Sequence, residues 1–353
     1  MFVQSLQRLS AAVFSALRRG QERCGKWVHA RPWLEAWFYR ECGVDAAYRE
    51  FNLWYFSQFS QQEKMLSDGP RMAFYHAAIA QSIKPGDRVI DLGTGTGVLA
   101  AFASRQGAAK VYALDHSGIL KHARRLASHN GIKNVDFITT HSRDFKLKDR
   151  VDVILHEQMG DYLFDEAMVA NVIDLRDRVL KPDGRIVPAR FEFFCEPIKV
   201  RDERRIPFIW ELNAHGFDCS CLERSRPQDP EYYSHASSDL GVVEHFLGRP
   251  EAALTVDLQT INMADLPPMI RVKRTVVNAG RLDGFVVFFR ARADEDLTLS
   301  TSPLEAGRAP HWGYRILRAE AGSFAAGEVI DLELTVGQWA EPHTWRWRQV
   351  RGG

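Results

Sequence analysis

The order of apolar and polar positions divides the chain into three parts. Residues 1 to about 80 have helical periodicity and many aromatic side chains, most of which we expect in a core. From about residue 88, short apolar runs alternate with helical patterns, which is typical of a parallel, doubly wound α/β sheet. After about residue 184, short β-rich runs separated by Gly, Pro and Asp predict a sandwich or barrel.

These patterns predict individual elements. In the middle part we expect strands at Arg88–Asp91, Lys110–Asp115, Val135–Thr139 and Val151–Leu155, and helices at Gly97–Gln106 and Ile119–Asn130. The character changes around Lys181–Gly184, after which we expect strands at Arg190–Pro197, Leu254–Ile261, Met269–Val277, Phe285–Ala291 and Val329–Val336. The predicted organisation is a helical extension over 1–50, an α/β domain over 51–188 and a β-rich domain over 189–353, with the boundary near Val187-Pro188.

Composition narrows the class of protein. The 353 residues are 45% apolar and 26% charged, as in an ordinary globular protein with ample core material. The 46 basic and 45 acidic residues nearly cancel, so no global field favours nucleic acid or an anionic membrane as partner. No apolar run approaches the roughly 18–20 residues of a membrane span. Five scattered cysteines favour free thiols in a reducing compartment, and we expect a cytoplasmic protein without a bound metal.

The first 21 residues are basic and amphipathic. They contain three arginines and no acid, with apolar residues at helical spacing. An organelle transit peptide is one interpretation. An amphipathic helix that docks on the domain is favoured, because any such helix has this periodicity.

A glycine-rich turn joins the first predicted strand to the first predicted helix. In Asp91–Gly97, glycine recurs at Gly93 and Gly95 and closes the turn, so the backbone can approach a ligand near the free N–H groups of the helix start. A dinucleotide fingerprint requires glycine where this chain has Val98. The spacing resembles instead the S-adenosylmethionine loop of class I methyltransferases, with Asp115 placed for the ribose hydroxyls. A tight turn without a cofactor is the alternative.

Two glutamates, Glu157 and Glu166, flank a short loop after the apolar strand Val151–Leu155. A buried pair of like charges is costly unless a cation lies between them. Loops at the carboxyl ends of strands are also where α/β sheets bind ligands. The pair therefore predicts a pocket for a cation, although most loop carboxylates are simply solvated.

Five separated motifs, in the same order, resemble the protein arginine methyltransferase family over roughly residues 50 to 340. They are Met65-Leu-x-Asp68-x-x-Arg71-x-x-x-Tyr75, the turn Asp91–Gly97, the loop Glu157–Glu166, the segment Gly216–Leu222, and Ser300–Pro303 followed by His311-Trp312. The resemblance implies S-adenosylmethionine as cofactor, arginine in proteins or peptides as substrate, and a β-barrel as the second domain. It also implies a helical arm at about 207–240 through which two copies form a homodimer.

The resemblance assigns roles to particular residues. Arg71 would bind the cofactor's carboxylate as a bidentate guanidinium, and Asp144 is the acid nearest to the family's adenine-contacting glutamate. The cofactor residues are then Met65, Arg71, Asp91, Gly93, Gly95, Gly97, Asp115 and Asp144, and the substrate pocket contains Phe56, Met168 and Trp312. Ordinary core packing explains Met65 and Met168 equally well.

The chemistry of arginine explains why two acids are useful. A guanidinium has a pKa above about 12, so it stays protonated at neutral pH. Its delocalised lone pairs make it a poor nucleophile. A sulfonium is a second cation, and like charges about 4 Å apart repel by roughly 4 kcal/mol at an effective dielectric near 20. We expect Glu157 and Glu166 to orient and polarise the substrate, with Glu166 as the proton acceptor. His311 would shape the pocket or relay the proton, unless it is merely structural.

The chain departs from the family pattern at the pocket's rim. Gln158 stands where the family has Trp, Asp161 where it has Tyr, and Pro310 where it has Thr, while Phe56 lacks the hydroxyl of a pocket Tyr. An extra acid at Asp161, beside Asp165, would suit free L-arginine or another small guanidino compound, or it could be a solvated surface acid. A catalytically silent dimeric partner is a third possibility, but it predicts a lost glutamate or a broken glycine loop, and both are intact.

Overall fold

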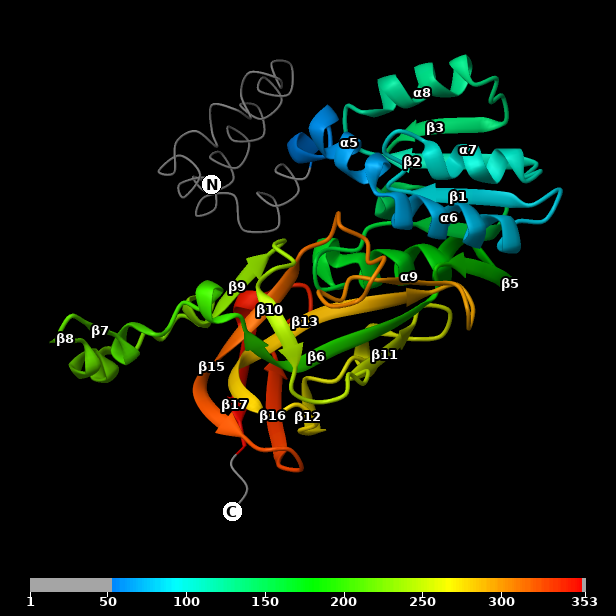
Figure 1. Cartoon of the computed structure of the whole chain (residues 1–353). Helices are drawn as coiled ribbons and strands as arrows, with labels where there is room; N and C mark the ends of the chain where they lie inside the picture. Colours follow the sequence, from blue (N-terminus) through cyan, green and yellow to red (C-terminus); the bar gives the residue numbers. More distant parts are fainter. Residues whose placement is uncertain (1–52, 351–353) are drawn as a thin grey trace, which may run out of the picture.

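The computed structural model describes residues 53–350, so the predictions for the extension 1–50, including the transit peptide, lie outside the described residues. Within 53–350, no helix has the length and apolar character needed to cross a membrane. The chain forms a parallel-sheet half, a β-rich half and a projecting arm (Figure 1).

The first half is a five-stranded parallel sheet with the order β3-β2-β1-β4-β5. Its strands are β1 (Arg88–Leu92), β2 (Lys110–Asp115), β3 (Val135–Thr139), β4 (Val151–His156) and β5 (Leu180–Val187). Its helices are α5 (Phe59–Ser67), α6 (Gly69–Ser82), α7 (Val98–Arg105), α8 (Leu120–His129) and α9 (Met168–Val179). The predicted ranges from the first strand to the fourth agree with the structure to within one residue at either end, which confirms the doubly wound sheet.

The last strand of this sheet is not among the predicted strands. The segment Lys181–Gly184, around which the character of the sequence changes, lies inside β5. Pairing with β4 shifts register between Val151 and Val153, and this irregularity accommodates the Pro-Asp-Gly turn residues within the strand. Burial of Ile186 on the same strand supplies apolar packing that the local turn signal does not reveal.

The second half consists of antiparallel sheets. One has the order β10-β6-β13-β15-β9 with β11 and β14 at its side, and the other has the order β12-β16-β17. The strands are β6 (Arg190–Val200), β9 (Ser234–Ser237), β10 (Val243–Phe246), β11 (Leu254–Asp257), β12 (Met269–Thr275), β13 (Gly280–Arg292), β14 (Thr298–Ser300), β15 (Tyr314–Phe324), β16 (Val329–Val336) and β17 (Trp345–Gln349). The predicted β-rich half is confirmed.

The predicted strand Leu254–Ile261 is too long. Strand β11 ends at Asp257, and the chain turns back so that the Ile261 N–H donates to the Asp257 carbonyl at 2.8 Å. The Arg176 guanidinium of α9 binds the carbonyls of Leu258 and Ile261, both at 2.9 Å. These hydrogen bonds from a helix distant in the sequence stabilise a turn at 258–261, where the apolar pattern alone predicts that the strand continues.

The helical part of the arm consists of short 3₁₀ helices, and a hairpin lies between two of them. Strands β7 (Asn213–Ala214) and β8 (Phe217–Asp218) form the hairpin, between the 3₁₀ turns η4 (Ile209–Glu211) and η5 (Ser220–Ser225). The segment projects away from the β-rich half (Figure 1).

The loop between β4 and α9 is held by aromatic packing against the β-rich half. The ring centroid of Phe164 lies 4.5 Å from that of Trp339 and 5.8 Å from that of Phe193. The Tyr162 hydroxyl donates to the Ala340 carbonyl at 3.0 Å. Both glutamates of interest flank these anchors, so packing between the two halves positions them.

The same loop contains three non-glycine residues in the left-handed backbone region. Their φ angles are 83° at Leu163, 61° at Glu166 and 53° at Ala167. L-residues avoid this region because Cβ crowds the carbonyl oxygen, at a cost of roughly 1–2 kcal/mol each. The surrounding packing therefore imposes a strained backbone beside Glu166.

We expect Ala167→Gly to raise the free energy of unfolding by about 0.5–1 kcal/mol, because glycine adopts this φ without a Cβ clash. Urea unfolding followed by circular dichroism measures the change. Ala170→Gly, inside α9, is the matched control and should lower the free energy of unfolding by about 0.5–1 kcal/mol. Equal destabilisation by both variants would contradict backbone strain at Ala167.

Candidate active site

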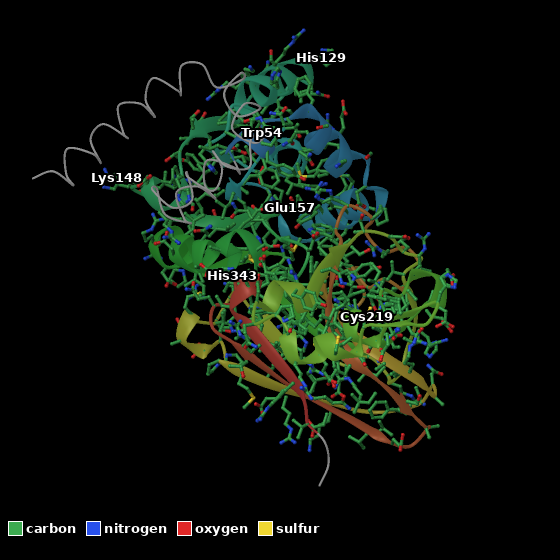
Figure 2. All side chains as sticks on the ribbon, turned by 90° about the vertical axis from the view of Figure 1, so that its left-hand side faces the viewer. Trp54, His129, Lys148, Glu157, Cys219 and His343 are labelled. Atoms are coloured by element: carbon green, nitrogen blue, oxygen red, sulfur yellow. The ribbon has the colours of Figure 1, made fainter. Side chains whose placement is uncertain are left out.

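The candidate site lies at the carboxyl ends of β1, β2 and β4, three neighbouring strands of the parallel sheet. Open α/β sheets bind ligands at this edge. Glu157, which follows β4, lies where the parallel-sheet half meets the β-rich half (Figure 2). Residues from α6, three strand ends and a loop of the β-rich half therefore share one region.

The glycine turn has a left-handed backbone. The φ angles are 71° at Gly93, 52° at Gly95 and 82° at Gly97. A Cβ on Gly97 would lie 2.8 Å from the Phe137 ring, so close packing between α7 and β3 also requires glycine there. The N–H groups of Gly93 and Gly97 donate to backbone carbonyls, so the turn is held in a fixed shape. Its glycines leave the backbone open to close approach by a ligand.

Two aspartates hold the turn in place. Asp91 is fully buried, and its Oδ2 accepts from Thr94 Oγ1 at 2.5 Å and from Ala100 N at 3.0 Å. Burial raises the pKa of Asp91 to about 7, while its Oδ1 has no hydrogen-bond partner among the described residues. Asp115 accepts from Gly95 N at 2.9 Å and from Ser117 N at 2.7 Å. Both carboxylates therefore face the turn.

Arg71 and Glu157 form a buried ion pair. Arg71 Nη2 lies 2.8 Å from Glu157 Oε2, and Arg71 Nε donates to Glu157 Oε1 at 3.2 Å. Arg71 Nη1 also donates to the Met65 carbonyl at 2.6 Å. Asp68 caps the start of α6 by accepting from Arg71 N at 2.9 Å, which fixes the position of the arginine on the helix. Glu157 is thus already neutralised by a cation from the protein.

Glu166 is in a different electrostatic state. It lies in the 3₁₀ turn η2 (Asp165–Ala167). Burial raises the pKa of Glu166 to about 8, and the negative charges of Glu157, Asp165 and Asp115 add to the shift. Burial also raises the pKa of Asp165 to about 6. At neutral pH Glu166 is therefore mostly a neutral acid, whereas its partner glutamate carries a paired charge.

A loop of the β-rich half closes the site. His311 N donates to Asp68 Oδ2 at 2.9 Å, and Trp312 Nε1 donates to the Met159 carbonyl at 2.5 Å. Trp312 is buried, and its ring lies 5.9 Å from the Arg71 guanidinium. Burial lowers the pKa of His311, so the imidazole is neutral near pH 7. His311 and Trp312 therefore lie beside the ion pair.

Other predicted site residues are less closely involved. Met65 and Met168 are buried, which ordinary core packing explains as well as a pocket does. Phe56 is partly buried, and its ring centroid lies 5.1 Å from that of Tyr55. Asp144 is exposed on η1 (Ser142–Asp144), and no hydrogen bond or ion pair within 53–350 joins it to the other predicted cofactor residues.

The structure adds two residues to which the sequence analysis assigned no role. Asp68 links Arg71 to His311, and only its place in the quoted motif signals its importance. Gln158 lies over the glycine turn: its Cγ is 3.3 Å from where a Cβ on Gly93 would be. Its Oε1 is buried and has no hydrogen-bond partner among the described residues. Sequence alone marks Gln158 only as a departure from the family.

These residues fit S-adenosylmethionine by their chemistry. Two buried acceptors without partners among the described residues, Asp91 Oδ1 and Gln158 Oε1, border a glycine turn whose backbone a ligand can approach closely. Arg71 offers a cation to a carboxylate, and Asp115 offers an acceptor to ribose hydroxyls. A methionine moiety and a ribose carry these complementary groups.

Comparison with known proteins agrees with this geometry. A family model described as a methyltransferase domain matches residues 83–212. The protein arginine N-methyltransferase PRMT10 of Arabidopsis thaliana is 30% identical over 322 residues, covering 82% of this chain and 84% of that protein. Protein arginine N-methyltransferase 6 of Danio rerio is 32% identical over 280 residues, covering 74% of this chain and 78% of that protein.

A solved structure shares the fold. The crystal structure of Arabidopsis thaliana protein arginine methyltransferase 10 superposes with a TM-score of 0.68 at 29% identity, covering 80% of this chain and 88% of that one. The shared fold and the extent of the sequence match together show that the chain belongs to the protein arginine N-methyltransferase family.

Proposed function

We propose that this protein transfers a methyl group from S-adenosylmethionine to the guanidinium of arginine in proteins or peptides. The observation that carries the proposal is the pair of partly buried glutamates, Glu157 and Glu166, beside the glycine turn, of which Glu157 is paired to Arg71. A cation-binding pocket next to a cofactor turn suits this reaction and explains why two acids lie close together out of bulk water. The relatives are named for the same activity.

The cofactor would be held from three directions. When bound, it supplies an electrophilic methyl group on a positively charged sulfur. Arg71 would pair with its carboxylate while keeping contact with Glu157, and Asp115 would accept from the ribose hydroxyls. The glycines of the turn Asp91–Gly97 would let the cofactor approach the backbone closely.

The two glutamates have different roles in this proposal. Glu157, which forms an ion pair with Arg71, orients the substrate guanidinium through the oxygen lone pairs that Arg71 does not use. Glu166 loses its proton when the cationic guanidinium enters, because the new positive charge lowers its pKa. As the carbon–nitrogen bond forms and the carbon–sulfur bond breaks, the Glu166 carboxylate accepts the proton that the methylated nitrogen loses. Neutral His311 would line the pocket with Trp312.

The structure bears on the choice between protein-bound and free arginine. Asp161, the acid that would hold the amino group of free arginine, is already engaged, because its Oδ1 accepts from Gly313 N at 2.8 Å. That engagement favours arginine within a polypeptide, whose backbone needs no such acid.

We place the boundary between the cofactor and barrel domains at Val187-Pro188, where β5 ends before β6 begins.

We also propose that two copies form a homodimer through the arm at about 207–240. The arm exposes large apolar side chains, which mark an interaction surface: Ile206, Ile209, Leu212, Phe217 and Leu222. Analytical ultracentrifugation should give twice the mass of one chain, and Phe217→Asp, whose side chain is 73% exposed, should shift the protein toward the monomer. A wild-type chain that sediments as a monomer at micromolar concentration would refute the dimer.

The activity is tested by incubation with labelled S-adenosylmethionine and an arginine-rich peptide, free L-arginine or buffer, followed by mass analysis. We expect label on peptide arginine. Glu166→Gln should lower turnover by about 10²–10⁴-fold, the usual contribution of an acid–base group, while binding of S-adenosylhomocysteine stays within about threefold because Glu166 does not hold the cofactor. Label on free arginine alone would exclude the peptide substrate, and no label on any substrate would indicate a silent relative.

The raised pKa of Glu166 predicts a pH dependence of substrate binding. Because Glu166 must ionise to bind the guanidinium, peptide affinity in the S-adenosylhomocysteine complex should rise by up to about tenfold per pH unit and level off above pH about 8. Calorimetry at pH 7 in two buffers of different ionisation enthalpy should show release of nearly one proton. Glu166→Gln should release none. A wild-type affinity that stays constant from pH 6 to pH 9 would exclude a protonated Glu166.

A further inference from the structure

One peptide group in the pocket loop, residues 301–313 between β14 and β15, is held at both of its ends by side chains of opposite charge. Arg308 Nη2 donates to the Trp312 carbonyl, and Asp161 Oδ1 accepts from Gly313 N at 2.8 Å. This carbonyl and this N–H belong to the same peptide plane. The guanidinium therefore faces the negative end of its dipole and the carboxylate faces the positive end, and both contacts resist rotation of the plane.

Arg308 is buried although the mechanism does not use it. Its exposed fraction is 6%, and its Nε and Nη1 have no hydrogen-bond partner among the described residues. Its guanidinium lies 5.9 Å from the Tyr314 ring. Burial lowers the pKa of Arg308, and Tyr314, Asp161 and Asp68 oppose that shift. Burying a guanidinium whose N–H donors are not all satisfied costs free energy of folding. The hydrogen bond from Arg308 to the Trp312 carbonyl therefore suggests a positional role.

Asp161 reaches the peptide only because residue 313 is glycine. A Cβ on Gly313 would lie 3.1 Å from Asp161 Oδ2 and 2.9 Å from the Ser237 carbonyl. Any other residue would push the carboxylate away or move the strand that carries Ser237. Asp161, Gly313 and Arg308 thus form one steric and electrostatic unit. Asp161 comes from the glutamate loop, residues 157–167 between β4 and α9, and the other two come from the pocket loop.

The clamped peptide directly follows the residues that close the site. His311 N is bonded to Asp68, and Trp312 Nε1 is bonded to the Met159 carbonyl. The two contacts to the 312–313 peptide group add a constraint directly after these residues, and they oppose rotation of that peptide plane. The clamp also ties the pocket loop to the glutamate loop, since Asp161 lies between Glu157 and Glu166.

We propose that Arg308 and Asp161 are positioning residues that clamp the 312–313 peptide and thereby orient His311 and Trp312 toward the bound arginine. This inference rests on the proposed methyltransferase function. It assigns Asp161 a backbone contact in place of a contact with substrate.

The test compares disruptive with conservative substitutions by steady-state methylation of an arginine-rich peptide. Asp161→Leu removes the acceptor and Arg308→Met removes the donor, and each should lower kcat at least tenfold with KM changed less than threefold. Asp161→Asn keeps an acceptor oxygen and Arg308→Lys keeps a cationic donor, so the kcat of both variants should lie within about threefold of the wild-type kcat. The kcat of the double variant Asp161→Leu/Arg308→Met should be no lower than that of the less active single variant, because both residues act through one peptide group.

A readout independent of activity is hydrogen exchange at the Gly313 amide. Exchange should quicken at least tenfold in both disruptive variants, while the amides of α9 and the affinity for S-adenosylhomocysteine stay unchanged. Glu305→Leu is the matched control, an exposed acid on the same loop paired with Arg290, and it should alter neither readout. If the disruptive variants do not fold, Asp161→Asn and Arg308→Lys still decide, since a kcat at least tenfold below that of the wild type in either folded variant would overturn the proposal.

Other outcomes would also overturn the clamp. Additive losses in the double variant would mean that the two residues act separately. A raised KM with unchanged kcat in Asp161→Leu would mean that Asp161 contacts the substrate. An inactive wild-type protein would instead refute the methyltransferase function, whereas an active one with unchanged Gly313 exchange in the variants would refute only the clamp.

Discussion

The ion pair between Arg71 and Glu157 is the interaction on which the rest of the site depends. It joins α6 to the end of β4, and its two nitrogen–oxygen contacts of 2.8 and 3.2 Å neutralise one of two partly buried glutamates. Glu157 therefore carries a compensated charge. Glu166 has no such partner from Arg71, and desolvation together with the nearby charge of Glu157 raises its pKa to about 8. The difference between Glu157 and Glu166 thus depends on Arg71, which is distant from both in the sequence.

Strain and packing give this electrostatic arrangement a defined geometry. The β4–α9 loop bends through left-handed residues, including Glu166 itself, and aromatic contacts with Trp339 and Phe193 hold it there. Such a backbone persists only where surrounding packing over-determines it. The β-rich half is therefore part of the site, because it supplies both the packing that bends this loop and the loop that carries His311 and Trp312.

Local sequence signals located most of the elements that bear the site. The alternation of apolar runs and helical patterns placed β1 through β4 within one residue, because buried parallel strands and their covering helices have strong local periodicity. The same approach missed β5 and overextended β11. In β5, Pro-Asp-Gly sits in a strand that pairs with an irregular register, and in β11 the Arg176 guanidinium captures two carbonyls. Neither cause is visible in a local window.

Taken by itself, the sequence determined the sheet, the glycine turn and the presence of two acids near it, since each depends on periodicity or on residue type at short spacing. Tertiary structure alone decided what those acids do. The Arg71 contact, the burial of Glu166 and the clamp of Asp161 and Arg308 on one peptide depend on residues that are distant in the chain. Charge state and hydrogen bonding are properties of the folded neighbourhood, and no pattern along the chain records them.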